Sequence, residues 1–306
     1  MTPMISVILP VFNGGAYLEP MLESLLAQTY GDFEIVCVDD GSTDGSSAVL
    51  ARFAGRDARV RVWRQENAGI IAARNAAISR ARGAFLALQD QDDLSEPRRF
   101  EAQIAAFACD LELVLCGTQA TQIDGKGRQL HATHLPTQHE DLIRRFPVEN
   151  PFCHCSVMMR RSVLDKLGRA YIYPEVDDYE LLFQVARLGR ATNLSERLYR
   201  YRVHRNQYSS RYHGRMLLAR AALQRDVICP ELGVPYRPVC LSFAMLDEVV
   251  FRAHQAGDRR KAMEAARAQL KQFWWHWRPY SWLVRICIGE RFYRGSQRVV
   301  ERILPA

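Results

Sequence analysis

The residues best suited to chemistry form an acidic cluster directly after an apolar run. Phe85–Leu88 is uninterrupted and apolar, which is typical of a buried parallel strand. Three carboxylates follow it, those of Asp90, Asp92 and Asp93. If the backbone stays extended, Asp90 and Asp92 point the same way and their oxygens converge on one hard divalent cation. The alternative is a solvated, Asp-rich turn before a helix that begins near Pro97.

Alternating strands and helices must position this cluster. The apolar runs predict strands over 5–11, 33–38, 60–63, 85–88 and 112–116, with helices over 18–26, 72–82 and 98–107. This alternation predicts a parallel sheet covered on both faces, and right-handed crossovers then bring the loops after the strands to one edge. Asn13, Asp39 and Asp40 also follow strands, so we expect them at the same rim as Asp90 and Asp92.

That rim has neither of the usual phosphate-binding loops. Residues 13–18 do not fit the G-x-G-x-x-G pattern of a dinucleotide-binding fold, and no P-loop is present. Carboxylates cannot cradle phosphates, but they can hold a cation that does, and they can accept hydrogen bonds from a base or a ribose. The rim therefore favours a nucleoside diphosphate held through a metal ion.

Several short motifs, taken together and in order, carry a resemblance to a known family. They are Pro10–Asn13, Val38–Asp44, Asn67–Gly69, Ala73–Asn75, Asp90–Asp93, Asn150–Pro151, His154–Ser156, Asp177–Asp178 and Tyr201–His204. Over about the first 210 residues the chain resembles the family 2 glycosyltransferases with the GT-A fold. The resemblance implies an α/β fold with a Rossmann-like, mostly parallel central sheet and flanking helices.

The resemblance also implies a donor site for a UDP- or dTDP-sugar. Asp40 corresponds to the residue that recognises the uracil or thymine ring, with Asp39 beside it, and Arg74 approaches the donor. A surface position on its helix is the alternative for Arg74. The implied donor-binding residues are Pro10, Phe12, Asn13, Asp39, Asp40, Asn67, Arg74 and Asp90.

A divalent metal is the implied cofactor. Asp90 and Asp92 correspond to the family's DxD pair, with Asp92 the direct ligand of Mg²⁺ or Mn²⁺. In related enzymes a histidine near His204 completes the metal site, and a surface histidine is the alternative. Such an ion bridges the two phosphates and neutralises charge on the departing nucleoside diphosphate.

The acceptor half is implied by a second acidic pair. Family members usually have Glu-Asp where this chain has Asp177 and Asp178, and Asp178 is the expected general base for the acceptor hydroxyl. Asp177 has an acceptor-side role or caps the helix that follows. His154 and Ser156 are expected to line the acceptor side. We expect no zinc site there, because Cys153 and Cys155 are spaced too closely for a structural zinc pair. The segment is interpreted as a strand.

Charge and composition divide the chain unevenly. Residues 211–306 hold 17 Lys and Arg against 8 Asp and Glu, whereas residues 1–210 hold 24 against 26. The resemblance implies a catalytic domain over 1–210, with a nucleotide-sugar half (1–118) and an acceptor half (119–210), and the basic remainder is expected to be a helical appendage over 211–306. Helices are expected over 216–227 and 244–256, and a solvent-facing hairpin turn over 122–134.

The last forty residues are basic and aromatic. Arg291, Arg294, Arg298 and Arg302 form one helical stripe, and tryptophans precede it. This pattern favours contact with the headgroup zone of an anionic membrane, and packing on the protein or on a second subunit is the alternative. We expect no nucleic-acid partner, because no recognised module for one accompanies the charge.

The resemblance thus implies an inverting, metal-dependent glycosyltransferase. We expect it in the cytoplasm, peripheral to the inner face of the membrane. The cysteines lie in apolar runs, which fits buried thiols in a reducing compartment. Neither a signal peptide nor a membrane-spanning segment is expected. The acceptor is expected to be a lipid-linked or surface-polysaccharide intermediate. The alternatives are a nucleotidyltransferase, whose Gly-rich first loop is missing, and a non-catalytic sugar-nucleotide-binding scaffold.

Overall fold

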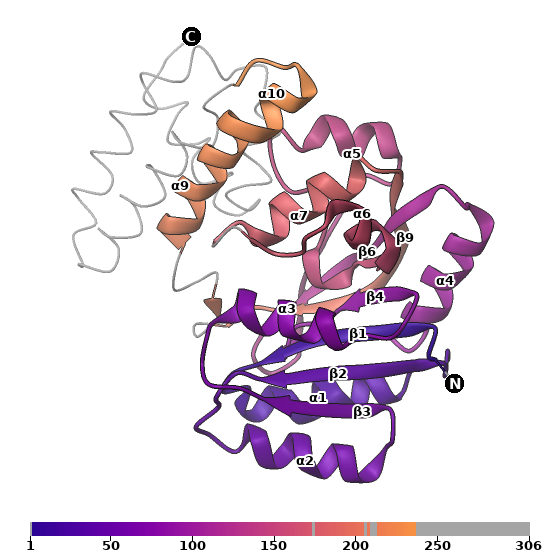
Figure 1. The fold of residues 1–306 in the computed structure, drawn as a ribbon, viewed down its shortest axis with the longest axis vertical. Coiled ribbons are helices and arrows are strands. Elements are labelled where there is room, and N and C mark those ends of the chain that lie inside the picture. Colours follow the sequence, from indigo (N-terminus) through magenta and orange to yellow (C-terminus); the bar gives the residue numbers. More distant parts are fainter. Residues whose placement is uncertain (1, 173–174, 205–206, 209–212, 237–306) are drawn as a thin grey trace. The chain divides into compact units, whose positions relative to one another are not determined.

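The computed structural model describes residues 2–172, 175–204, 207–208 and 213–236. Within these residues one nine-stranded sheet runs in the order β3-β2-β1-β4-β8-β6-β9-β5, with β7 paired to β6 (Figure 1). The strands are β1 Ile5–Val11, β2 Phe33–Asp39, β3 Val60–Arg64, β4 Phe85–Leu88, β5 Leu94–Ser95, β6 Leu113–Ile123, β7 Gln129–Ala132, β8 Met158–Arg160 and β9 Arg190–Arg202.

Helices follow most of these strands. They are α1 Gly15–Leu26, α2 Ser46–Arg56, α3 Ile70–Arg80, α4 Arg99–Cys109, α5 His139–Arg145, the 3-10 helix η1 His154–Ser156, α6 Arg161–Leu167, α7 Asp177–Ala186, α9 His213–Leu223, the π-helix η2 Gln224–Ile228 and α10 Cys229–Leu232. The expected α/β architecture is confirmed.

The first strands are buried on both faces, which is why they read as continuous apolar runs. In β1, Val7 and Leu9 pack with α1, α2 and α4, whereas Ile8 belongs to the cluster that contains α3, α5, α6 and α7. Side chains alternate between the two faces of a strand, so one apolar run can supply both cores. Figure 1 shows α3 on one side of β1–β3 and α1 and α2 on the other.

The sheet is mostly parallel but not wholly so. β1 pairs in parallel with β2 and with β4, and β6 pairs in parallel with β9. The short strand β8 lies between β4 and β6 and is antiparallel to both. Glu112–Cys116, expected as a short fifth strand, lengthens to β6, and its far end forms the predicted hairpin with the exposed strand β7.

The chain divides into two units, and every described residue lies in the first, Met1–Cys240. Helix α9 covers much of the predicted helix over 216–227 and belongs to the first unit. Among the residues that the structure describes, no helix is both long and apolar enough to cross a bilayer. The predicted helix over 244–256 and the basic stripe lie outside the described residues.

Candidate active site

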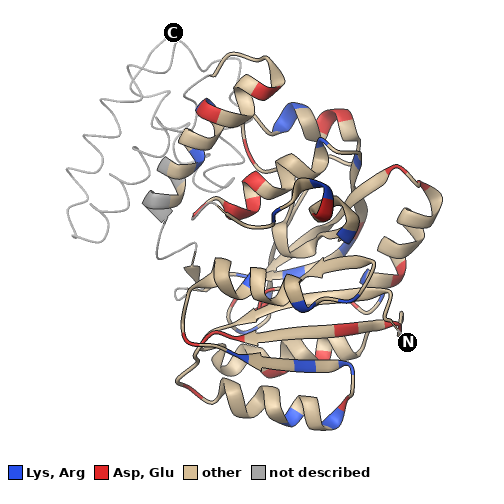
Figure 2. Ribbon diagram, viewed as in Figure 1, with Lys and Arg blue, Asp and Glu red and all other residues tan. Residues whose placement is uncertain are grey.

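A cavity of about 1280 Å³ opens at the carboxyl ends of β1, β2 and β4. Its lining combines the loops after these strands with residues of η1, the start of α7, the end of β9 and Met216 of α9. Acidic residues gather at the ends of β2 and β4 and at the first turn of α7 (Figure 2). The predicted gathering of carboxylates at one rim is therefore what the fold produces.

One part of the lining comes from the loops after β1 and β2. Asn13 has a left-handed backbone (φ 50°), which Asn tolerates well, and its Oδ1 accepts the backbone N–H of Thr43 at 2.8 Å. Asp40 accepts N–H groups from Ala68 and Gly69, each at 2.9 Å. These contacts hold the loop that contains Asn67 against the cavity. Pro10 and Phe12 line it as well, and Phe12 is 44% exposed.

The loop after β4 turns sharply at its centre. Gln91 exchanges two hydrogen bonds with the backbone of Phe12, at 2.9 and 3.0 Å. Arg202 donates from Nε to the carbonyl of Asp92 at 2.7 Å, and its backbone N–H donates to Asp93 Oδ1 at 2.6 Å. The loop is therefore fastened to β1 on one side and to β9 on the other. The backbone is not extended here, because residues 91–92 form a turn, as in the alternative that the sequence left open.

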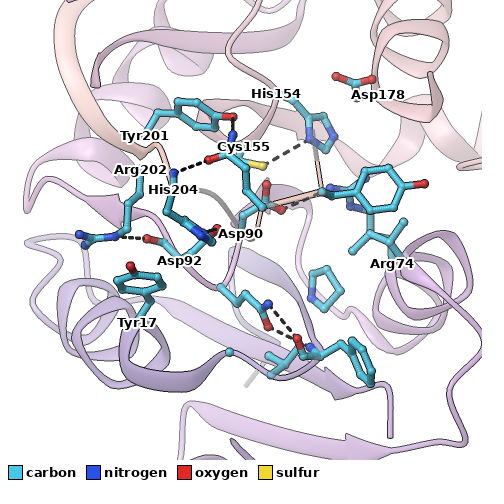
Figure 3. Close-up of a pocket in the computed structure, with 18 of the residues that line it drawn as sticks. Tyr17, Arg74, Asp90, Asp92, His154, Cys155, Asp178, Tyr201, Arg202 and His204 are labelled. Atoms are coloured by element: carbon cyan, nitrogen blue, oxygen red, sulfur yellow. Dashed lines mark hydrogen bonds and ion pairs between the residues drawn. The ribbon is translucent and has the colours of Figure 1, made fainter. Parts of the chain in front are cut away.

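As a result of this turn, the two carboxylates of the DxD pair have different partners. Asp92 Oδ2 lies 2.8 Å from His204 Nε2, whereas Asp90 Oδ1 accepts from Arg74 Nη2 at 3.3 Å. Figure 3 shows Asp90 between two groups of side chains, with Asp92 and His204 on one side and Arg74 on the other. Burial and the charge of Asp90 raise the pKa of Asp92, and the contact with His204 opposes that rise.

The donor atoms around this loop fit a divalent cation. Asp92 and His204 offer an oxygen and a nitrogen at the cavity wall. Asp90, Asp93 and Cys155 place one ligand atom each within 4.8 Å of one another. Asp93 Oδ2 is buried and has no hydrogen-bond partner. Burial and the charge of Asp92 raise the pKa of Asp93 well above its usual range. A positive charge in this region would relieve the repulsion among these carboxylates.

Arg74 lies between the loop after β4 and helix α7. Its side chain is almost buried, with Nη1 donating to Asp177 and Nη2 to Asp90, and its guanidinium carbon lies 5.3 Å from the centre of the Tyr171 ring. Burial acts to lower the pKa of Arg74, but Asp177 and Asp90 outweigh it and hold the pKa well above the usual value. The guanidinium thus stays charged and joins two sides of the cavity.

Helix α7 brings the second acidic pair to the cavity. Val176 precedes the helix and no side chain caps it, so the alternative in which Asp177 caps the helix is wrong. Asp177 pairs with Arg74 instead. Asp178 lines the cavity, and Asn150 Nδ2 donates to its Oδ2 at 3.4 Å. Burial and the charge of Asp177 raise the pKa of Asp178 to about 6. A carboxylate with such a pKa is ionised at neutral pH and can accept a proton.

The Cys153–Ser156 segment differs from its prediction. It is not a strand, because the N–H of Ser156 bonds to the carbonyl of Cys153 at 2.9 Å and makes the 3-10 turn η1. His154 lines the cavity, and its Nε2 lies 2.8 Å from the Tyr171 hydroxyl. Burial and the nearby Arg74 lower the pKa of His154 to about 3, so its ring is neutral.

Two predicted site residues lie away from the cavity. Ser156 is fully buried, and its hydroxyl donates to the carbonyl of Cys153 at 2.8 Å. Asp39 is also buried and accepts from the N–H of Ser42 at 2.9 Å and from the Ser47 hydroxyl. Both residues fasten loops that line the cavity, and neither belongs to the lining.

Further residues that were not predicted from the sequence hold the site together. Tyr17 lines the cavity, with its ring 5.0 Å from that of His204 and 4.7 Å from the Arg202 guanidinium. Arg202 lies inside a motif already singled out, so its spacing from His204 could have identified it. Gln91 likewise lies inside the Asp90–Asp93 motif, whereas Tyr171 lies in none of the motifs.

Comparison with known proteins identifies the family of the chain. The family model described as glycosyl transferase family 2 matches residues 6–168. The O-antigen biosynthesis glycosyltransferase WbnJ of Escherichia coli is 31% identical over 207 residues, which cover 66% of this chain and 80% of that protein.

Two solved structures share the fold. S. aureus TarS 1–349 in complex with UDP-GlcNAc has a TM-score of 0.59 at 16% identity, covering 88% of this chain and 91% of that one. The mannosyltransferase PcManGT from Pyrobaculum calidifontis, in complex with GDP-Man and Mn²⁺, has a TM-score of 0.55 at 18% identity, covering 88% and 80%. The family match, with this shared fold, shows that the chain belongs to glycosyl transferase family 2 and is a glycosyltransferase.

Proposed function

We propose that this enzyme transfers a sugar, with inversion, from a UDP- or dTDP-sugar to a hydroxyl group of a lipid-linked or surface-polysaccharide acceptor, and that it requires Mg²⁺ or Mn²⁺. The observation that carries the proposal is the placement of Asp178 in the same cavity as Asp90 and Asp92. An acid–base group and a cluster suited to a cation thus share one space.

The size of the cavity supports a reaction between two substrates. Small-molecule sites usually occupy about 300–1,000 Å³, and this cavity of about 1280 Å³ exceeds that range. On the donor side, Asp40 and Asn67 would contact the base, between Pro10 and Phe12. TarS and PcManGT were solved with UDP-GlcNAc and GDP-Man, which supports a nucleotide-sugar donor here.

Asp178 is the proposed general base. It would accept the proton of the acceptor hydroxyl as that oxygen attacks the anomeric carbon, and a single displacement of this kind inverts the configuration. Asn150 orients the carboxylate through the 3.4 Å contact, and burial keeps its pKa close to neutrality. The neutral His154 ring lines the same cavity, and its Nε2 is paired with the Tyr171 hydroxyl at 2.8 Å.

Asp92 and His204 are the proposed metal ligands, with Asp90 beside them. When bound, a divalent ion would neutralise the charge that develops on the departing nucleoside diphosphate. Tyr17 and Arg202 hold the imidazole and the loop in place for that role.

The acceptor class and the location are inferred from a relative and from the cysteines. WbnJ is named for O-antigen biosynthesis, which supports a polysaccharide intermediate as acceptor. Cys37 and Cys116 are buried free thiols, which supports a cytoplasmic site for the reaction. Attachment of residues 273–306 to an anionic membrane stays a prediction.

Calorimetric titration of the protein with a panel of sugar nucleotides, with and without Mn²⁺, tests the proposal. We expect one UDP- or dTDP-sugar to bind in the presence of the metal, and release of the nucleoside diphosphate when an acceptor is added. The anomeric configuration of the product, read by NMR, tests inversion. Binding of nucleoside triphosphates with release of pyrophosphate would instead support a nucleotidyltransferase. Donor binding without turnover on any acceptor would support a scaffold.

A further inference from the structure

The Arg74 side chain forms hydrogen bonds with two carboxylates that come from opposite sides of the cavity. Nη2 donates to Asp90 in the loop after β4, and Nη1 donates to Asp177 at the start of α7, 103 residues away in sequence. A guanidinium can bond two partners through separate nitrogens in a fixed plane, which a lysine ammonium cannot reproduce. In this arrangement both terminal nitrogens already have partners within the protein.

The surroundings of Arg74 hold the guanidinium in this bridge. Asn75, the next residue of α3, donates to the carbonyl of Tyr171 at 2.8 Å and accepts its N–H at 3.1 Å. The Tyr171 ring lies 5.3 Å from the guanidinium carbon. Helix α3 thus anchors the segment that leads to α7 as well as the first acidic residue of that helix.

We propose that Arg74 is a positioning residue, which couples the two halves of the site by tying Asp177 to Asp90 and so fixes the neighbouring Asp178 toward the acceptor. This inference rests on the proposed function of Asp178 as the base. It differs from the role that the family resemblance implies for Arg74, which is direct contact with the donor.

Charge gives the same bridge a second effect. The ionisable groups that act on Asp178 are Asp177 on its own helix, Arg74 on α3, Tyr171 in the segment before α7 and Arg220 on α9. Asp177 favours the protonated form of Asp178, whereas Arg74 and Arg220 favour the ionised form. Loss of Arg74 therefore favours protonation of the base, and loss of the Asp177 charge favours its ionisation.

The test compares Arg74→Lys, Arg74→Met and Asp177→Asn with Arg80→Met, which removes an exposed arginine at the far end of the same helix. For each variant we would measure the Kd of the donor with Mn²⁺, the kcat for transfer, the pH dependence of kcat/KM and the melting temperature. Arg80→Met should match the wild type in all four.

We expect the Arg74 variants to bind donor within about 3-fold of the wild type, while kcat falls by about 10²-fold, as for other small misplacements of a reacting group. The acidic limb of the pH profile should move to higher pH by about one unit in Arg74→Met and less in Arg74→Lys. In Asp177→Asn the limb should move to lower pH, again with donor binding intact.

A tenfold or greater loss of donor affinity in Arg74→Lys with an unmoved acidic limb would overturn the inference and make Arg74 a donor ligand. If Arg74→Met does not fold, Asp177→Asn still decides, because unchanged kcat in that variant would show that the bridge is dispensable. If the proposed function is wrong, the wild-type chain itself will not bind the donor or transfer the sugar. If only this inference is wrong, the wild type will be active and the variants will lack the expected changes in kcat and in the pH profile.

Discussion

His204 Nε2 and Asp92 Oδ2 lie 2.8 Å apart, although 112 residues separate them in the sequence. The end of β9 and the loop after β4 make this contact possible, because Arg202 fastens the backbone of the same loop. Both side chains are mostly buried at the cavity wall. A carboxylate oxygen and an imidazole nitrogen at the wall of an acidic cavity offer two ligands to an octahedral ion, and a bound diphosphate and water would supply the others.

The first prediction concerns this pair. Asp92→Asn should abolish transfer, and His204→Gln should weaken the apparent affinity for Mn²⁺ by about 10-fold or more, because each variant removes a proposed ligand. EDTA should abolish activity in the wild type, and added Mn²⁺ should restore it. Asp141→Asn, which alters an exposed carboxylate on α5, is the control. Full activity of Asp92→Asn in EDTA would refute the metal role.

The second prediction concerns the base. Asp178→Asn should bind donor like the wild type and slow transfer by about 10²–10⁴-fold, the usual contribution of a positioned base. In the wild type, kcat/KM should fall as the pH drops below about 6, because Asp178 becomes protonated there. The residual activity of Asp178→Asn should not show this fall in kcat/KM at acidic pH. If donor affinity collapses together with the rate, Asp178 is a donor ligand or a structural residue.

The bounds of a strand could be predicted from the sequence where a continuous apolar run is buried on both faces of the sheet. β1 and β4 have the predicted bounds because each is apolar on both faces. The rim of carboxylates followed from the same logic, since the carboxyl ends of parallel strands meet at one edge. β8 was not predicted, because three residues are too few to show an alternation of apolar and polar side chains. Its place between β4 and β6 depends on pairing with strands that are distant in the sequence.

Individual side chains were harder to place than the rim itself. Asp39 and Asp40 are neighbours at the end of β2, and successive side chains of a strand face opposite ways, so Asp40 reaches the cavity and Asp39 does not. Both were predicted to bind donor. The bridge from Arg74 to Asp177 could not be predicted from spacing, because it joins residues that only the folded sheet brings together.

The third prediction concerns the C-terminal stripe, which lies outside the described residues. Each basic side chain near an anionic surface contributes about 1 kcal/mol, and salt screens that attraction within a Debye length. Replacing Arg291, Arg294, Arg298 and Arg302 with Gln should therefore reduce co-sedimentation with anionic vesicles at low salt, and neutral vesicles should bind neither protein well. The control replaces four exposed arginines of the first unit, namely Arg52, Arg56, Arg128 and Arg144. Equal loss in both variants would refute a specific role for the stripe.

The last prediction links the base to stability. In the folded protein the pKa of Asp178 is about 6, above its ordinary value of 3.8, so the ionised form is disfavoured by folding. This destabilisation is fully present above about pH 6 and disappears as the pH falls toward 3.8. Asp178→Asn stays neutral at every pH, and it should therefore be more stable than the wild type at pH 8 by about 1–3 kcal/mol.

Thermal unfolding of both proteins between pH 4 and pH 8 measures this difference. Each kcal/mol added to the free energy of unfolding should raise the melting temperature of a unit of this size by about 2–4 °C. The difference in melting temperature between the two proteins should disappear toward pH 4. Asp177→Asn is the matched control with the opposite sign, because it removes a partner of the buried Arg74 and should unfold at lower temperature than the wild type at pH 8. A melting temperature for Asp178→Asn below that of the wild type at pH 8 would mean that Asp178 stabilises the fold, and that its position is maintained for structure and not for proton transfer.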